Sequence, residues 1–597
     1  HDLGITAGVQ ISFGRSGVSY QSHMDTGGGH RYHSYGVRLG ALDRNIRDHY
    51  FNRNKQYVDV AVRGSLVYQN YRFFDNRTTF LSILESIEIA KKDPSVKGIV
   101  VNTTNMNVDP AKAWELYEQL VAFRETGKEV VVYVERGGMS HLYLIAAASY
   151  VVMDPMGTMQ IPGYIFGRTY LAEFLEEVGI GVQEIRKADY KTAAESFTRT
   201  SMSDAEREQI SAIVTQWYEG IREIISEEKG LEEDLFDDMI NRGLVVSPDD
   251  LVEAGIVDTL ARFDHVQGIL NKLENRRVSR TSARSLYTNN LPSDTRWGPE
   301  KVIQVLYAEG STSMTSGIRA RVLANAIKQA AANPSVKAIV MRVDSPGGDA
   351  LASDIVAEQI KNAANRKPVI ISMGFVAASG GYWIAMEADS IVATPQTITG
   401  SIGVIMPHLY DDGLQRKLRL HSDFVSRGES ADLSHGPSLP LIGLQLPGRP
   451  LREDEMEHFD TYITSMYDLF IDRVAEGRNL EADDVREIAG GRVWTGRDAR
   501  DKGLVDELGG LQTAIQIAKE AAGIKPGDKV ILQEGPATQP FSLPMLLGQV
   551  FTSSGNRMSQ TTTDPMKNYI EMIIDHHGQP LMIMPFEEFS WIYYIQD

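Results

Sequence analysis

The sequence predicts an α/β protein with two tandem domains, each built on a largely parallel sheet flanked by helices. The first observation behind this prediction is an internal duplication: residues 93–101 (DPSVKGIVV) are matched by residues 333–341 (NPSVKAIVM). Lys97 thus corresponds to Lys337, 240 positions later. Because stacked repeats have periods of roughly 20–50 residues, a period this long indicates two duplicated domains.

The second observation is the alternation of short apolar runs with amphipathic runs in both copies. In the second copy we expect strands at 302–307, 338–343 and 369–373, with helices at 319–332 and after Gly348. In the first copy we expect strands at 98–102 and 129–134 and a helix at 111–125. Continuous apolar strands that alternate with helices are typical of parallel sheets covered on both faces.

The duplication also sets the expected domain boundaries. We expect a first repeat at 57–275 and a second at 300–525, joined by a linker at 276–299 that is rich in Arg, Ser, Thr and Asn. Residues 1–56 form an N-terminal extension whose strand-like alternation at 5–13 and 35–42 predicts an edge hairpin or a flexible arm around a glycine turn at 27–29. Residues 526–597 form a C-terminal tail, and we expect its apolar stretch at 580–594 on a neighbouring element or near the functional site.

The composition excludes several classes of protein and site. A net charge of −19 without a basic cluster argues against a nucleic-acid partner. The absence of cysteine excludes disulfides and a cysteine nucleophile. No apolar run is long enough to cross a bilayer without interruption. The chain begins at His1 with neither a signal peptide nor an initiator Met, so we expect a trimmed form from which an anchor could have been removed.

A glycine pair at 347–348 follows one of the predicted strands. Gly347 and Gly348 let backbone N–H groups face outward with no side chain in the way, and the helix that follows adds partial positive charge. Such a place suits a developing oxyanion, although Pro-Gly-Gly alone predicts only a tight turn. Asp349 puts a carboxylate beside it, which either tunes the site or caps the helix.

A serine with small neighbours follows the next strand. Ser379 stands between two alanines and two glycines, which leaves its hydroxyl open to a substrate backbone. A serine at the start of a helix ordinarily caps it. Combined with the Gly347-Gly348 turn on an adjacent parallel strand, the sequence favours a nucleophile over a cap.

A serine nucleophile needs a base, and the sequence offers two kinds of candidate. The histidines nearest in sequence, His408, His421 and His435, lie in loop-like stretches with no recognisable acidic partner. The other candidate is Lys191, although a single lysine is ordinarily solvated. A lysine acts as a base near neutral pH only if burial lowers its pKa from about 10.4.

The two copies are complementary in these residues. At the 240-residue offset, Ala431 stands opposite Lys191, so the second copy lacks this lysine. Aligning Tyr143 with Tyr382 puts Ser140 opposite Ser379, but His141 replaces the glycine at 380. One copy therefore carries the candidate base and the other the candidate nucleophile.

Four motifs in this order resemble the bacterial signal peptide peptidases of the S49 serine protease family, in their long, tandem-domain form. The resemblance spans about residues 57–525, and its motifs are Ser-Pro-Gly-Gly at 345–348, Ala-Ser-Gly-Gly-Tyr-Trp-Ile-Ala at 378–385, Thr-Gly-Ser-Ile-Gly-Val at 399–404 and Tyr-Lys-Thr-Ala at 190–193. The chain departs from the family at Asp349, where a small uncharged residue is usual, and in residues 1–56, where a single anchoring helix is expected.

The resemblance implies ClpP/crotonase-like domains and a Ser–Lys dyad that needs no metal or cofactor. Ser379 would be the nucleophile, Lys191 the base and Ser401 a residue that orients the lysine. The backbone N–H groups of Gly347, Gly348 and Gly380 are the candidates for the oxyanion hole.

The function implied is that of an endopeptidase, which degrades released signal peptides and other extended apolar peptides. The resemblance also implies a membrane-associated homo-oligomer, a tetramer, in the bacterial cell envelope, at the inner membrane and facing the periplasm. Two other hypotheses remain open: a non-catalytic scaffold on the same fold within an envelope assembly, and a crotonase-type acyl-CoA enzyme.

Overall fold

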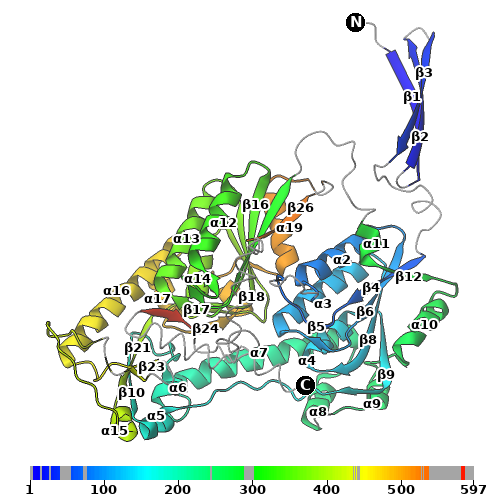
Figure 1. The fold of residues 1–597 in the computed structure, drawn as a ribbon. Coiled ribbons are helices and arrows are strands. Elements are labelled where there is room, and N and C mark those ends of the chain that lie inside the picture. Colours follow the sequence, from blue (N-terminus) through cyan, green and yellow to red (C-terminus); the bar gives the residue numbers. More distant parts are fainter. Residues whose placement is uncertain are drawn as a thin grey trace. The chain divides into compact units, whose positions relative to one another are not determined.

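The chain divides into two compact units whose boundaries do not follow the two repeats. The computed structural model describes residues 4–13, 16–25, 29–39, 55–70, 77–242, 245–287, 301–433, 436, 438–439, 444–525, 528, 530–536 and 580–584. Unit 1 comprises His1–Asp109, Ala113–Gly163 and Gly220–Pro299, and unit 2 comprises Pro110–Lys112, Tyr164–Glu219 and Glu300–Asp597 (Figure 1). Residues 164–219, which we assigned to the first repeat, therefore belong to the same compact unit as the second repeat. Part of the expected linker (288–299) and most of the tail after 525 lie outside the described residues.

The described part of unit 1 contains a six-stranded sheet in which all neighbouring strands are parallel. Its order is β11-β9-β8-β6-β4-β12. The strands are β4 (Gln56–Ala61), β6 (Val96–Asn102), β8 (Glu129–Gly137), β9 (Tyr150–Met159), β11 (Thr259–Leu260) and β12 (Ser279–Ser282), with a separate short pair, β5 (Gly64–Ser65) and β7 (Met106–Asn107). The expected strands at 98–102 and 129–134 are confirmed as parts of β6 and β8.

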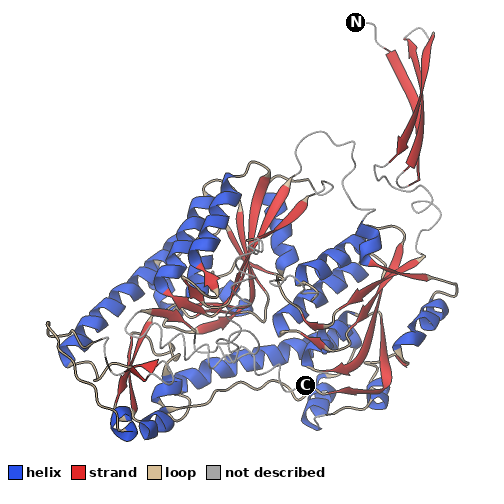
Figure 2. Cartoon of the chain, in the orientation of Figure 1, coloured by secondary structure: helices blue, strands red, loops and turns tan. Residues whose placement is uncertain are grey.

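Helices lie on either side of this sheet (Figure 2). They are α2 (Phe80–Lys92), α3 (Pro110–Arg124), α4 (Met139–Ala147), α8 (Glu233–Arg242), α9 (Pro248–Glu253), α10 (Val266–Leu273) and α11 (Ala283–Tyr287), with a 3₁₀ turn at Phe263–His265. The expected helix at 111–125 is α3. In α2, apolar residues three and four apart, such as Phe80, Leu84 and Ile87, are buried, as an amphipathic helix requires.

The N-terminal extension forms a three-stranded antiparallel sheet rather than the expected hairpin. Its strands are β1 (Gly4–Phe13), β2 (Ser16–Asp25) and β3 (His30–Leu39). The sequence did not reveal β2 because Ser, Gln and His interrupt its apolar pattern. Cross-strand pairs join these polar residues instead, such as Tyr20 with His33 Nδ1 at 2.8 Å and the stacked rings of His23 and Tyr32. The expected turn at 27–28 lies outside the described residues.

The main sheet of unit 2, over the residues that the structure describes, has eight strands and is parallel except at one edge. Its order is β24-β20-β18-β16-β13-β26, with β19 and β25 paired beside β18 and with β24 antiparallel to β20. The strands are β13 (Val302–Glu309), β16 (Val336–Ser345), β18 (Val369–Ala378), β19 (Ser390–Ala393), β20 (Ile398–Gly400), β24 (Val493–Thr495), β25 (Glu507–Leu508) and β26 (Ile531–Gly535). The three strands expected in the second copy are confirmed, and the one expected to end at Val343 continues to Ser345.

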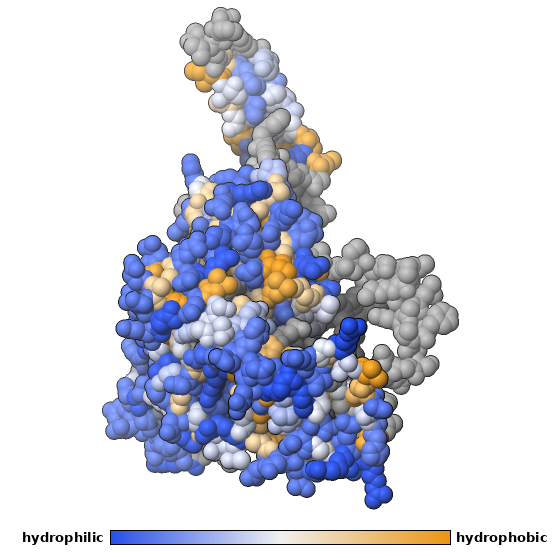
Figure 3. All heavy atoms as spheres, turned by 90° about the vertical axis from the view of Figure 1, so that its left-hand side faces the viewer, coloured by the Kyte–Doolittle hydropathy of each residue, from blue (hydrophilic) through white to orange (hydrophobic). Residues whose placement is uncertain are grey.

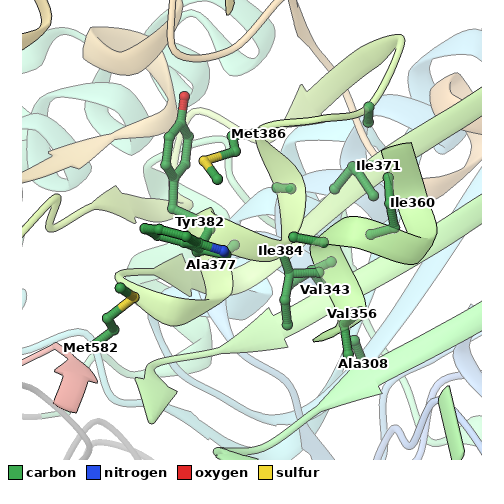
Figure 4. Packing of buried hydrophobic residues seen from close by; sticks show 14 of the residues in the cluster. Ala308, Val343, Val356, Ile360, Ile371, Ala377, Tyr382, Ile384, Met386 and Met582 are labelled. Carbon is green, nitrogen blue, oxygen red and sulfur yellow. The ribbon is translucent and has the colours of Figure 1, made fainter. Parts of the chain in front are cut away.

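The helices of unit 2 enclose a large apolar core around this sheet. They are α5 (Ala172–Val178), α6 (Glu195–Thr198), α12 (Ala320–Ala332), α13 (Ala350–Ala364), α14 (Gly380–Ala385), α15 (Leu414–Leu418), α16 (Glu453–Arg478), α17 (Ala482–Ile488), α18 (Gly496–Asp501) and α19 (Leu511–Ala521); α7 (Asp204–Lys229) starts in unit 2 and ends in unit 1. The short helix α14 is buried throughout, and its Tyr382 and Ile384 pack with Val343 and Ile371 of the sheet (Figure 4).

A second sheet in unit 2 joins segments that are far apart in the sequence. Its order is β10-β21-β27-β17-β14-β15, built from β10 (Ile180–Arg186), β14 (Thr312–Ser313), β15 (Ile318–Arg319), β17 (Gly347–Asp349), β21 (Ile405–Asp411) and β27 (Leu581–Ile583). A separate hairpin joins β22 (Ser438–Leu439) and β23 (Leu444–Gln445). The second sheet brings residues of the first repeat, the glycine pair and the C-terminal tail into one structure.

Among the described residues, no helix is long and apolar enough to span a membrane. On the face drawn in Figure 3, hydrophilic residues predominate and hydrophobic ones form small separate groups. A charge of −19 is consistent with such a surface.

Candidate active site

Unit 2 brings Lys191 and Ser379 into direct contact although they are 188 residues apart. The Lys191 Nζ lies 2.6 Å from the Ser379 Oγ. Both side chains are 0% exposed. The alternative of a solvated surface lysine is thus wrong.

The backbone presents Ser379 in an unusual conformation. The residue lies between the end of β18 at Ala378 and the start of α14 at Gly380, with φ 56°. Positive φ is uncommon for a serine and typically costs on the order of 1–3 kcal/mol, so the surrounding structure must impose it. The Ser379 N–H donates to Gly400 O at 2.8 Å, which fixes the turn. Its side chain makes no capping hydrogen bond to α14, so the capping alternative is also wrong.

Glycines after Ser379 let the chain pack tightly there. A Cβ on Gly380 would lie 2.6 Å from Ser353 Oγ, and one on Gly381 would lie 2.5 Å from Ser345 O. The aromatic residues that follow anchor α14: the Tyr382 hydroxyl donates to Leu504 O at 3.0 Å. The turn that holds Ser379 is therefore fixed from both sides.

The loop that carries Lys191 is held by its backbone carbonyl groups. It follows β10, which pairs with β21. The Arg168 guanidinium donates to Thr192 O at 2.7 Å and to Ala193 O at 3.3 Å, and Glu206, which is fully buried, lies 2.5 Å from it. Sequence reasoning missed this buried ion pair, because neither residue belongs to a local motif.

Burial lowers the pKa of Lys191 well below its usual value, since no charged group of the described residues offsets the loss of solvation.

Ser401 completes the surroundings of the lysine. Its carbonyl oxygen and its Oγ lie 2.8 and 2.9 Å from Lys191 Nζ. Ser401 follows β20, is buried, and has φ 51°, while its N–H donates to Arg492 O at 2.7 Å. The structure therefore brings together all three side chains that the sequence singled out.

The glycine pair lies on the other side of Ser379. Gly347 and Gly348 form the short strand β17, not a simple turn, and have φ of 104° and 144°. A Cβ on Gly347 would lie 2.7 Å from Gly380 N, so the three glycines adjoin one another. The Gly347 N–H donates to Ser345 Oγ at 3.2 Å.

Asp349 caps a helix. Its Oδ1 accepts a hydrogen bond from Ala352 N at 2.5 Å at the start of α13. This decides between the two roles that the sequence left open for its carboxylate.

The histidine candidates occupy other places. His408 lies on β21, where its Nε2 is 3.2 Å from Arg449 O. His421 is exposed in a loop, and His435 lies outside the described residues. The contact of Ser379 Oγ with Lys191 identifies the lysine as the candidate base instead.

In unit 1 the serine that the sequence aligns with Ser379 lies within helix α4 and has different surroundings. Ser140 Oγ donates to Val108 O at 3.0 Å. His141 is buried, accepts a hydrogen bond from Gly138 N at 3.1 Å, and has a pKa lowered to about 4 by desolvation.

Comparisons with known proteins place the chain in a peptidase family. The model of peptidase family S49 matches residues 122–277 and 361–525. The chloroplastic serine protease SPPA of Arabidopsis thaliana is 32% identical over 520 residues, which cover 84% of this chain and 74% of that protein. Protease 4 of Salmonella typhi is 30% identical over 489 residues, 79% of this chain and 76% of its own.

The chain was also compared with a solved structure of a mutant of the 1510-N membrane-bound stomatin-specific protease, in complex with a substrate peptide. The sequence identity is 16% and the TM-score is 0.26, and the match covers 42% of this chain and 99% of that one. The family match covers more than half of the chain, and the sequence relatives extend over most of it. The chain is therefore a serine peptidase of family S49.

Proposed function

We propose that the chain is an endopeptidase that works through a Ser–Lys dyad, with Ser379 as the nucleophile and Lys191 as the general base. The observation that carries this proposal is the 2.6 Å contact between two fully buried side chains, Lys191 Nζ and Ser379 Oγ. A buried amine next to a hydroxyl is the arrangement that a lysine base requires.

The three contacts of Lys191 Nζ match the bonding capacity of a neutral amine. Two N–H groups donate to the carbonyl oxygen and the Oγ of Ser401. The lone pair then faces Ser379 Oγ and accepts its proton, whereas an ammonium has no lone pair to offer. The lowered pKa of Lys191 favours this neutral form. Ser401 thus acts as a positioning residue.

In the first half of the reaction, Ser379 Oγ attacks the carbonyl carbon of a peptide bond while its proton passes to Lys191 Nζ. The carbonyl oxygen becomes an oxyanion, which backbone N–H groups stabilise. The C–N bond then breaks and the lysine returns its proton to the leaving amine, which leaves an ester on the serine. In the second half, a water gives its proton to the lysine and attacks the ester, and the lysine then passes that proton to Ser379 Oγ as the acid leaves.

We assign the oxyanion donors to Gly348 and Gly380. The Gly347 N–H is already engaged with Ser345 Oγ, so Gly347 serves by leaving space beside Gly380 N. Removing a single such donor typically lowers the rate by about 10²–10³-fold.

The resemblance to the signal peptide peptidases extends the proposal to substrates and location. We infer that the substrates are released signal peptides and other extended apolar peptides, bound by backbone pairing to a strand edge. We also infer a membrane-associated homotetramer in the cell envelope, facing the periplasm. The native mass of the purified protein and its accessibility in spheroplasts test these two statements.

The test of the dyad is hydrolysis of an apolar fluorogenic peptide between about pH 6 and 10, a range chosen to bracket a lowered lysine pKa. We expect wild-type kcat/KM to rise with pH through one ionisation below 10.5, as Lys191 loses its proton. Lys191→Ala should abolish turnover, whereas Lys187→Ala, which removes a partly exposed lysine of the same loop, should not. An active Lys191→Ala chain would contradict the dyad, and an inactive wild type would favour the scaffold hypothesis.

A further inference from the structure

The C-terminal tail contributes a strand to the sheet that carries the glycine pair. Strand β27 pairs antiparallel with β17, in the register Gly347↔Ile583, Gly348↔Met582 and Asp349↔Leu581 (Figure 1, red). The Met584 N–H donates to Pro346 O at 2.8 Å. Since hydrogen-bonded pairs alternate in an antiparallel ladder, Gly348 and Met582 form the next such pair. The tail thus uses the glycine that we assign as an oxyanion donor.

The carbonyl group of Met582 lies beside the glycines of the proposed oxyanion site. A Cβ on Gly347 would overlap Met582 O and would lie 2.7 Å from Gly380 N. A Cβ on Gly380 would lie 3.1 Å from the same oxygen. The space beside the glycines, next to Ser379, is therefore filled by a peptide carbonyl of the chain itself.

Alternate side chains of this segment belong to different apolar clusters. Leu581 and Ile583 pack with Ala193, Ala194 and Phe197, which follow Lys191 in the sequence.

The intervening side chains enter two other clusters. Met582 joins the core cluster that contains Tyr382 (Figure 4), and Met584 packs with Trp217 and Phe375. The four residues from 581 to 584 are each 0% exposed. Backbone pairing to a strand, with pockets for alternate side chains, is how proteins bind extended peptides.

The segment lies outside the part of the chain that matches the family. The family match ends at residue 525, and the strand begins at 581. Strand β27 links the two halves of the second sheet, β10-β21 and β17-β14-β15, and each half keeps its own pairing without it. The match also leaves out residues 278–360, which contain the glycine pair, so β27 and its partner β17 both lie outside it.

We propose that Pro580–Met584 occupies the groove in which substrate peptides bind and competes with them. This inference rests on the proposed function, because it identifies the groove by its position beside Ser379. The occupied groove also indicates the substrate class: an extended peptide with apolar side chains at successive positions. With an intramolecular competitor, the apparent Kd of a substrate equals its intrinsic Kd divided by the fraction of chains whose groove is open.

The test measures peptide binding to full-length chains that carry Ser379→Ala, so that no cleavage intervenes. The probe is a fluorescent peptide, Pro-Leu-Met-Ile-Met, followed by anisotropy. Leu581→Asp with Ile583→Asp should expel the strand, because two carboxylates would otherwise be buried without partners. We expect at least about a tenfold lower Kd than for the parent chain.

Matched controls separate release of the groove from a general effect of added charge. Val252→Asp with Leu273→Asp places two carboxylates at partly exposed helix positions of unit 1 and should leave the Kd unchanged. Leu581→Ala with Ile583→Ala loosens the strand without adding charge and should also lower the Kd. This variant provides the test if the Asp variant does not fold. Equal Kd values in the parent and the folded release variant would overturn the proposal.

Hydrolysis by chains with intact Ser379 separates this proposal from the proposed function. The release variant should cleave the fluorogenic peptide faster than the wild type at subsaturating substrate. If no chain cleaves any peptide, the catalytic proposal fails, while the binding measurement still decides whether the strand occupies the groove. A wild type that removes its own tail after Met582, seen by mass spectrometry, would make the segment a substrate and overturn its role as a stable competitor.

Discussion

The sequence aligns Ser140 of the first copy with Ser379 of the second, but the two serines occupy different places at the start of their helices. Ser140 lies within the first turn of α4, and its hydroxyl donates to Val108 O. Ser379 lies before α14 at positive φ, and its hydroxyl contacts Lys191. The comparison shows that the fold tolerates either arrangement. In the proposed dyad, the serine is followed by a glycine and meets a lysine from elsewhere in the chain.

A short pair of strands near each serine also differs between the two copies, in its glycine content. In unit 1, β5 and β7 form a parallel pair, as β14 and β17 do in unit 2. Residues 103–107 of the first copy contain no glycine, and Asn105 is the residue with positive φ there. The glycine pair and strand β27 occur together in unit 2.

The largest expected difference between the copies is in activity after removal of each hydroxyl. Ser379→Ala should lower kcat by at least about 10⁴-fold, as loss of a nucleophile does in other serine peptidases. Ser140→Ala should change it less than about twofold, since its hydroxyl only satisfies a carbonyl. Rates on a fluorogenic peptide and labelling by a fluorophosphonate measure both. Equal losses in the two variants would mean that the copies do not differ as proposed.

A smaller loss should follow when the glycine after the nucleophile gains a side chain. Gly380→Ala puts a methyl group 2.6 Å from Ser353 Oγ and 3.1 Å from Gly347 Cα, which would displace the N–H that we assign to the oxyanion. We expect kcat to fall about 10²–10³-fold, the usual effect of losing one such donor. His141→Ala, the control in the other copy, should leave kcat unchanged. A fully active Gly380→Ala chain would remove Gly380 from the oxyanion site.

Burial of Lys191 should lower the free energy of unfolding of the chain near neutral pH. The second copy has no lysine at the aligned position and so contributes no such effect. The unfolded chain binds a proton at Lys191 below about pH 10.5, whereas the lowered pKa keeps the folded chain from binding it. Wild-type stability should therefore rise with pH through this window, by about 1.4 kcal/mol per unit. Lys191→Met should remove that slope and be more stable than the wild type at pH 7. Urea unfolding at several pH values measures this, with Lys187→Met as the control; an unchanged slope would contradict a neutral, buried lysine.

The smallest effect concerns the residue that orients the base. Ser401→Ala removes one of two acceptors for the Lys191 N–H groups. Loss of one hydrogen bond, worth about 1 kcal/mol, should lower kcat/KM about fivefold. An ammonium gains more from this acceptor than an amine does, so the pKa of Lys191 should fall and the rising limb of the pH profile should move to lower pH. If the rising limb of the pH profile stays in place or moves to higher pH, Ser401 has only a structural role.

The sequence predicted the fold class and the three side chains at the centre of the site, because both depend on signals that recur. Continuous apolar strands and amphipathic helices predicted β6, β8, β13, β16 and β18, and the family's motifs contain Ser379, Lys191 and Ser401. Long-range partners were not visible. Strand β17 pairs with β14 and with β27, a segment more than two hundred residues later, and no local pattern predicts such a distant partner.

The buried ion pair behind the lysine loop was missed for a related reason. Arg168 and Glu206 are charged residues in unremarkable surroundings, and a sequence suggests that such residues are exposed. Only the fold shows that Arg168 donates to carbonyl groups at 192 and 193. These contacts use the backbone of the loop and not its side chains, so they leave no pattern of residue types.

Because Tyr164–Glu219 belongs to unit 2, the first copy of the gene supplies a segment that folds with the second. The lysine is encoded with the first copy but folds with the serine of the second. A genetic crossover within the linker would exchange one copy for a homologous one and could mismatch the two halves of the dyad. Deleting the first copy would delete the lysine altogether. With the proposed dyad, a tandem gene whose copies have specialised in this way can be shortened or shuffled only at the loss of that chemistry.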